Sequence, residues 1–90
     1  MTKPELVKEI AARAGISQKS AARALDAFTQ VVTEALARGD SVRLVGFGTF
    51  EVRKRAARKG VVPGTKKTIQ IPERTVPFFR PGSALKKAVE

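Results

Sequence analysis

The basic residues of this chain are concentrated in its second half. Residues 53–87 contain eleven lysines and arginines and one acidic residue, whereas residues 1–52 contain seven basic and six acidic residues. In a split of this kind the balanced half holds the fold, and the basic half is an electrostatic footprint. We interpret this segregation as a surface for a polyanion and not as a device for solubility, because solubility does not require separation by sign.

The first half of the chain predicts two helices. Thr2 and Glu5 have the spacing of a capping box, and Gly15 is placed to end the first helix in the left-handed conformation. Ser17 is expected to cap a second helix that runs to Arg38 and stops at Gly39. Its apolar residues form a stripe too wide for one short neighbouring helix to cover, which predicts a partner subunit: Ala21, Ala24, Leu25, Phe28, Val31, Val32, Ala35 and Leu36.

The second half predicts strands. Apolar and polar residues alternate on both sides of Gly46-Phe47-Gly48, which indicates a hairpin with one apolar face. A third strand is predicted at residues 68–71, as an edge or irregular strand because Pro72 and Pro77 follow it. Residues 57–66 contain almost no core material and predict a flexible basic arm that nucleic acid would order. A short helix is expected at residues 83–90.

The composition argues against catalysis. The chain has no cysteine and no histidine, and its acidic residues show no metal-ligand spacing. Gly46-Phe47-Gly48 precedes a strand, so it does not fit a phosphate loop. We therefore expect no catalytic residues, no metal, no cofactor and no small-molecule substrate. Charged residues at the N-terminus and the lack of an apolar run of about 20 residues predict a cytoplasmic protein that does not engage membranes.

Several short motifs occur in a fixed order over essentially the whole chain: Gly46-Phe47-Gly48-Thr49-Phe50, Arg55 and Arg58, Pro63 and Thr65, Val76-Pro77-Phe78-Phe79, and Gly82-Ser83-Ala84-Leu85-Lys86. Together they resemble the HU and integration host factor family of bacterial DNA-bending proteins. The resemblance implies an α+β fold in an intertwined dimer, with two N-terminal helices, a three-stranded antiparallel sheet with a protruding β-arm, and a short C-terminal helix. A single domain at 1–90 would then comprise a helical dimerisation base at 1–39, a sheet saddle at 40–82 with its arm at about 54–70, and the C-terminal helix at 83–90.

The resemblance also implies a function. A homodimer would bind duplex DNA through minor-groove arms, intercalate a proline, here Pro63, and bend the duplex with little sequence preference. Nicked, gapped or bent DNA would bind best, and the protein would be associated with the nucleoid and contribute to its compaction. Residues 61–62 are two valines where many family members have Arg-Asn, and Lys66 replaces a common glycine. We therefore expect this arm to rely more on apolar contact and less on groove electrostatics.

The expected DNA-binding residues are Lys3, Arg53, Arg55, Arg58, Lys59, Val62, Pro63, Lys66, Lys67, Arg74, Arg80 and Lys86. Lys3 is explained equally well as a solvated lysine, and Pro63 also suits a turn before Gly64. The five phenylalanines are interpreted as core and not as stacking platforms, since the chain has no tyrosine or tryptophan. The expected dimer core is Phe28, Val32, Leu36, Leu44, Phe47, Phe50 and Phe79. A sequence-preferring bender like integration host factor and a basic RNA-binding protein remain as alternatives.

Overall fold

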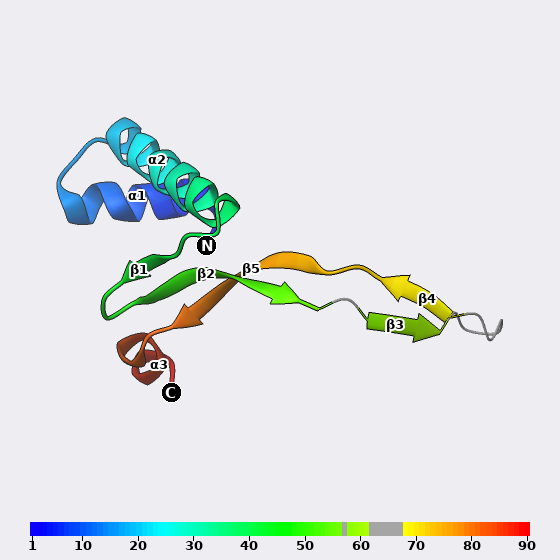
Figure 1. The fold of residues 1–90 in the computed structure, drawn as a ribbon. Coiled ribbons are helices and arrows are strands. Elements are labelled where there is room, and N and C mark those ends of the chain that lie inside the picture. The colour runs from blue at the N-terminus through cyan, green and yellow to red at the C-terminus, as the bar shows by residue number, and fades with distance from the viewer. Residues whose placement is uncertain (57, 62–67) are drawn as a thin grey trace. The chain divides into compact units, whose positions relative to one another are not determined.

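The computed structural model describes residues 1–56, 58–61 and 68–90, with the backbone alone described at 58–61 and 68–71. This part of the chain forms two compact units, Met1–Glu34 and Ala35–Glu90. The boundary between them falls near the end of the second helix. The elements, labelled in Figure 1, are α1 (Lys3–Ala14), α2 (Gln18–Ala37), β1 (Val42–Leu44), β2 (Gly48–Arg55), β3 (Arg58–Val61), β4 (Thr68–Ile71), β5 (Arg74–Pro81) and α3 (Ser83–Val89).

The caps of the first two helices follow the sequence in most respects. Gly15 has a φ of 68° and its N–H donates to the Ala11 carbonyl, so it ends α1 as predicted. The Ser17 hydroxyl accepts a hydrogen bond from the Ser20 N–H at 3.0 Å and caps α2. The capping box at Thr2 is wrong, because the Thr2 hydroxyl makes no hydrogen bond to the backbone and instead donates to the Glu5 carboxylate at 3.2 Å.

The core of the helical unit is small. Val7, Ala11 and Ala21 are buried, with Ala21 completely inaccessible. Short side chains at these positions let α1 and α2 pack closely, but they bury little apolar area. Larger apolar residues of α2 stay accessible, with 39% of Phe28 and 58% of Val31 exposed. The helical unit therefore carries more apolar surface than its own two helices cover.

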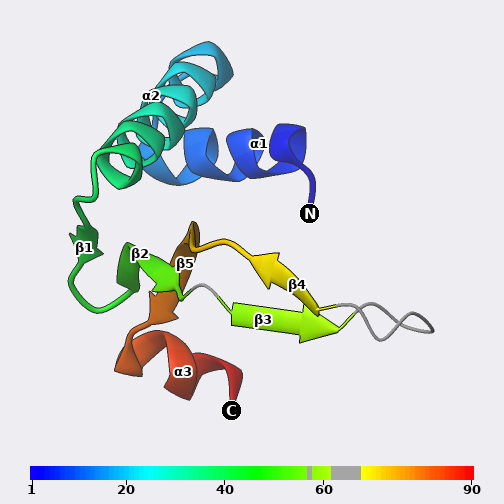
Figure 2. The same cartoon turned by 45° about the vertical axis from the view of Figure 1, so that its right-hand side comes forward.

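The second unit contains a three-stranded antiparallel sheet in the order β1-β2-β5. Its third strand is β5, at Arg74–Pro81, and not the predicted segment at 68–71. That segment is β4, which pairs with β3 in a separate two-stranded ladder, visible in Figures 1 and 2. The strands β3 and β4 lie within the range of about 54–70 that was predicted for the arm, apart from Ile71 at the end of β4. Pro77 lies within β5, which is an edge strand of this sheet. An edge strand tolerates a proline, which has no N–H to donate.

One face of the three-stranded sheet is apolar. The Phe79 ring lies 4.8 Å from that of Phe50, its partner across the strands, and 5.5 Å from that of Phe47. Gly48 makes this packing possible, since a Cβ there would lie 2.5 Å from the Phe79 ring. Glycine is therefore required at position 48 for space.

Helix α3 is joined to the turn between β1 and β2. The N–H of Gly82 donates to the carbonyl of Phe47 at 2.7 Å, directly before the helix begins. Together these elements confirm the predicted α+β architecture of two N-terminal helices, a three-stranded antiparallel sheet and a short C-terminal helix. Within the described ranges, no helix is both long and apolar enough to cross a membrane.

Candidate nucleic-acid interface

The opposite face of the three-stranded sheet is basic. Residues directly opposite one another on paired antiparallel strands point to the same face. Five cross-strand pairs therefore share this face. They are Arg43 with Thr49, Thr49 with Arg80, Glu51 with Phe78, Arg53 with Val76, and Arg55 with Arg74. We call it the basic face, and it consists of Arg43, Thr49, Glu51, Arg53, Arg55, Arg74, Val76, Phe78 and Arg80.

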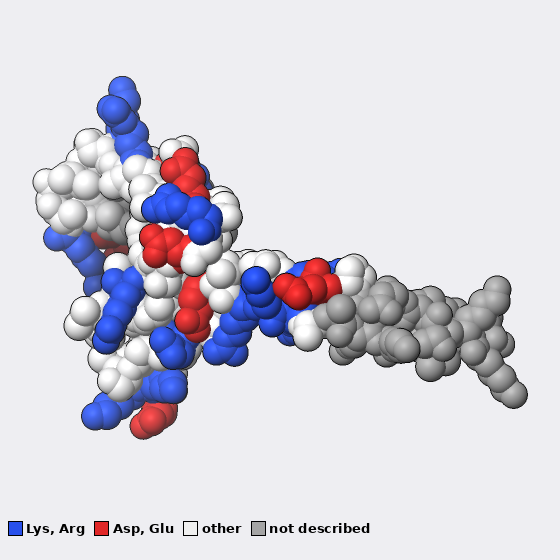
Figure 3. Space-filling view, viewed as in Figure 1, with Lys and Arg blue, Asp and Glu red and all other residues white. Residues whose placement is uncertain are grey.

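Near β1 the basic face is hollowed. A cavity of about 560 Å³ is lined by residues of all three strands and of α3, among them Arg43, Arg80 and Lys86. The lining also includes the carboxylate of Glu51 and hydroxyl groups such as that of Thr49. Figure 3 shows several basic side chains on the visible surface of this unit, with acidic and uncharged residues between them. Such a surface attracts the phosphates of a nucleic acid.

In the middle of the basic face, Phe78 and Glu51 contact the Arg53 side chain. Its guanidinium lies 3.5 Å from the centroid of the Phe78 ring, a cation–π contact. Its Nη2 also lies 3.7 Å from an oxygen of Glu51, the same oxygen that lies 3.9 Å from Nε of Arg80. Two arginines are thus oriented by neighbours within the face.

The end of the basic face that leads to β3 and β4 is different. Arg55 and Arg74 are directly opposite each other, and like charges in such a cross-strand pair repel. The nearby acidic residue, Glu73, is paired with Lys54 at 3.9 Å, and Lys54 belongs to the other face by strand alternation. Within the described part of the chain, neither Arg55 nor Arg74 has an acidic partner. An external anion would relieve their repulsion.

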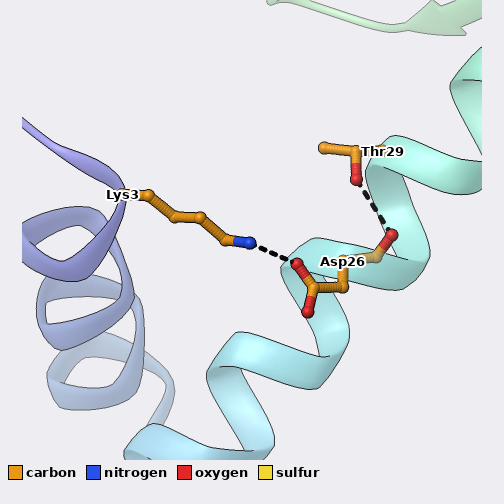
Figure 4. Close-up of polar contacts among 3 residues, drawn as sticks. All are labelled: Lys3, Asp26 and Thr29. Carbon is orange, nitrogen blue, oxygen red and sulfur yellow. Dashed lines mark hydrogen bonds and ion pairs between the residues drawn. The ribbon is translucent and has the colours of Figure 1, made fainter.

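Lys3 lies in the helical unit and is paired with Asp26. Its Nζ is 2.6 Å from the Asp26 carboxylate, while the Thr29 hydroxyl donates to the Asp26 backbone carbonyl at 2.9 Å (Figure 4). The side chains of Lys3 and Asp26 remain 62% and 52% exposed. Lys3 also lines a groove of about 420 Å³ with two further lysines, Lys8 and Lys19.

The structure gathers some of the predicted DNA-binding residues and leaves others undescribed. Four of them share the basic face and Lys86 lines its cavity: Arg53, Arg55, Arg74 and Arg80. Arg58 and Lys59 lie in β3, opposite Ile71 and Gln70 of β4, with only their backbone described. The remaining four, Val62, Pro63, Lys66 and Lys67, lie outside the described residues.

Arg43 and Phe78, two members of the basic face, were not among the predicted DNA-binding residues. Arg43 alternates with Val42 and Leu44, so the same period-2 pattern that defined the apolar face places it on the basic one. Phe78 differs from the interpretation of all phenylalanines as core, because it lies opposite Glu51 on the basic face and is 37% exposed. Its neighbour Phe79, one residue later, faces the apolar side.

The predicted dimer-core residues are only partly covered within one chain. Val32, Leu36, Leu44, Phe50 and Phe79 are half-buried, whereas Phe28 and Phe47 are 39% and 48% exposed. Among the described residues, no large apolar side chain is fully buried. The same residues contain no cluster of acidic side chains that could hold a metal ion.

The fold combines a helix pair, a two-stranded ladder and an antiparallel sheet with one apolar and one basic face. These features define a class of small proteins whose sheet exposes arginines that can bind a polyanion. The sequence pattern described as "Bacterial DNA-binding protein" matches residues 1–90. The chain belongs to this bacterial DNA-binding protein family, in agreement with the resemblance to HU and with the expectation that it is not an enzyme.

Individual relatives agree with that assignment. The chain is 56% identical to the DNA-binding protein HU of Thermotoga maritima over 90 residues, which is 100% of both proteins. It is 56% identical to the DNA-binding protein HU-beta of Salmonella typhimurium over 89 residues, 99% of each. Among solved structures, the cocrystal of Anabaena HU with DNA matches with a TM-score of 0.88 and 42% identity, covering 99% of this chain and 97% of the other.

Proposed function

We propose that this protein is a histone-like, nucleoid-associated DNA-binding protein that binds duplex DNA with little sequence preference and bends it. The observation that carries the proposal is the basic face. Five arginines project from one side of a small sheet, and the residues that accompany them include a single carboxylate. Phosphate contacts from such a surface fix a protein on DNA without reading its sequence. The cocrystal of the similar Anabaena protein with DNA supports the same ligand.

The protein acts as a homodimer in this proposal. Support comes from the accessible apolar side chains of α2 and from Phe47, which one chain leaves about half exposed. A second copy would cover these surfaces and supply the apolar burial that the alanine-rich helical core lacks. It would also bring two basic faces together and double the formal charge of +10.

The arm supplies the bending step. Val62 and Pro63 lie outside the described residues, and their role is proposed from the family resemblance. An apolar wedge that enters between base pairs concentrates the strain of bending at a kink. Smooth bending of a short site costs about 1–6 kcal/mol, and DNA that already contains a nick has part of this strain relieved.

The proposal is tested by binding to an intact and a singly nicked duplex, for the wild type and Pro63→Ala, between 50 and 200 mM salt. If a dimer makes about 6–10 phosphate contacts, its affinity falls about 10³–10⁵-fold over that range. We expect the wild type to prefer the nicked duplex and the variant to lose the preference while keeping the salt dependence. Equal binding of both duplexes by the wild type would refute bending. A footprint at one preferred site would indicate sequence preference, and tighter binding of structured RNA would indicate an RNA-binding protein.

A further inference from the structure

Glu51 is the one acidic residue in the three strands that form the basic face. β1, β2 and β5 comprise residues 42–44, 48–55 and 74–81, and they contain six lysines and arginines besides Glu51. A carboxylate opposes phosphate binding wherever the two approach each other. Its place in the middle of a surface proposed to bind DNA therefore needs a physical explanation.

The contacts of Glu51 place its charge between two arginines. Its Oε1 lies 3.7 Å from Nη2 of Arg53 on the same strand and 3.9 Å from Nε of Arg80 on the neighbouring strand. The Glu51 side chain is only 25% exposed, whereas those of Arg53 and Arg80 are 53% and 62% exposed. The Glu51 side chain is thus the least exposed of the three, and it also lines the cavity of the basic face.

These ion pairs are weak enough to be exchanged. Both distances exceed the range of a direct hydrogen bond, so the arginine donors keep their capacity to bind another acceptor. Solvent-exposed ion pairs of this kind contribute little to stability. A phosphate can accept two parallel hydrogen bonds from one guanidinium, which is a stronger interaction than Glu51 provides in this geometry.

We propose that Glu51 is a built-in counterion of the DNA-binding surface, which neutralises Arg53 and Arg80 in the free protein and limits their affinity for DNA phosphates. The proposal rests on the proposed function. When DNA binds, phosphates contact the two arginines, and the nearby carboxylate repels these anions. Glu51 thereby lowers the affinity for DNA, and it reduces repulsion between Arg53 and Arg80 when no DNA is present.

The chain provides a matched control in Glu73. Its Oε1 lies 3.9 Å from Nζ of Lys54, and Lys54 belongs to the opposite face of the sheet. Glu51→Gln and Glu73→Gln each remove one negative charge per chain and nearly preserve side-chain shape. A general effect of net charge would change the two affinities equally, whereas the proposal predicts a difference.

The test is a titration of a fluorescent intact duplex with full-length wild type and both variants, at several salt concentrations. We expect Glu51→Gln to bind about 3–10-fold more tightly than wild type at low salt, which corresponds to about 0.7–1.4 kcal/mol. Glu73→Gln is expected to change affinity less than about twofold, because among the described residues Glu73 pairs with Lys54 of the opposite face and with no arginine of the basic face. The gain from Glu51→Gln should shrink as salt screens the interaction.

Two outcomes would overturn the proposal. Equal gains for the two variants would mean that only net charge matters, and weaker binding by Glu51→Gln would mean that Glu51 positions the arginines for DNA. Glu51→Asp separates these roles further, because it keeps the charge but moves it. A counterion role predicts affinity close to wild type for this variant, and a positioning role predicts a loss. Absence of DNA binding by the wild type would instead refute the proposed function.

Discussion

The two units of the molecule differ in their balance of charge. Met1–Glu34 carries five basic and four acidic residues, and Lys3 and Arg13 are paired with Asp26 and Glu9 at 2.6 and 3.4 Å. Ala35–Glu90 carries thirteen basic and four acidic residues. The net charge of +10 is therefore almost entirely a property of the second unit. Charges paired inside the fold contribute modestly to its stability, whereas unpaired ones remain available to an external anion.

The same two units also differ in how they pack. Alanines dominate the buried positions between α1 and α2, whereas three phenylalanine rings pack together beside the sheet. The three rings are larger than the buried alanines, but Phe50 and Phe79 are only half-buried and Phe47 is 48% exposed. Their ring contacts stabilise the apolar face of the sheet whose other face presents the unpaired charge.

The largest effect is expected from removing the centre of the aromatic cluster. Phe79→Ala eliminates the ring contacts with Phe47 and Phe50 and should cost about 3–5 kcal/mol in the free energy of unfolding per chain. Chemical denaturation measures this loss. Phe79→Leu keeps much of the volume and should cost clearly less. A loss below about 1 kcal/mol for Phe79→Ala would show that the cluster does not anchor the sheet.

The next largest effect concerns the unpaired arginines of the second unit. Arg55→Gln combined with Arg74→Gln should weaken binding to an intact duplex about 10–100-fold, because charge-assisted contacts to phosphate are lost. Thermal stability should stay the same or rise, since a repulsive cross-strand pair is removed.

The control for this variant makes the same charge change in the helical unit. Arg13→Gln combined with Arg23→Gln should alter affinity less than about threefold, because these residues belong to the unit whose charges are balanced. Similar losses for both double variants, measured in parallel titrations, would mean that the distinction between the units has no bearing on DNA binding.

A smaller effect distinguishes two glycines, one in each unit. Gly48→Ala should cost about 1–3 kcal/mol in stability, because the new methyl group would collide with the Phe79 ring. Gly15→Ala should cost about 1–2 kcal/mol for a different reason, since Gly15 has a φ of 68° and open space around its Cα. Asparagine tolerates the left-handed conformation but needs even more room than alanine. We therefore expect Asn to be accepted at position 15 and rejected at position 48, as thermal unfolding would reveal.

The smallest effect is expected at the ion pair of the helical unit. Asp26→Asn removes the partner of Lys3 and should lower stability by about 0.2–1 kcal/mol at low salt. The difference from wild type should vanish near 1 M salt, where the screening length is about 3 Å. Asp40→Asn, which loses a longer contact of 3.7 Å to Arg38, should have less effect still. Persistence of the Asp26→Asn defect at high salt would indicate lost packing and not lost charge.

Local patterns in the sequence were sufficient to predict most of the elements. Gly15 and Ser17 marked the ends of the helices, and alternation around Gly46-Phe47-Gly48 predicted the hairpin and its apolar face. These signals depend on backbone preferences of single residues and on the period of one strand. These signals can therefore be read from the sequence without knowledge of any long-range contact.

The prediction failed where strand pairing decides the outcome. The segment at 68–71 has the composition of a strand, but only register shows that it pairs with β3 and that β5 completes the sheet. Phe78 and Phe79 are chemically identical neighbours, and pairing with Glu51 and Phe50 sends them to opposite faces. For the same reason the contact between Glu51 and Arg80, which lie 29 positions apart, was not visible in the sequence.

The pairing of Arg55 with Arg74 has a consequence for how the molecule can change in evolution. It is the last rung of the β2–β5 ladder, and it brings together the two ends of an 18-residue segment that includes β3 and β4. The entropy of closing a flexible loop grows only logarithmically with length, by about 0.6 kcal/mol per doubling. Insertions or deletions between these two positions would therefore change the reach of the loop at little cost to the sheet that carries it. The length of the segment between Arg55 and Arg74 and the stability of the three-stranded sheet are therefore nearly independent. Selection can change one without changing the other.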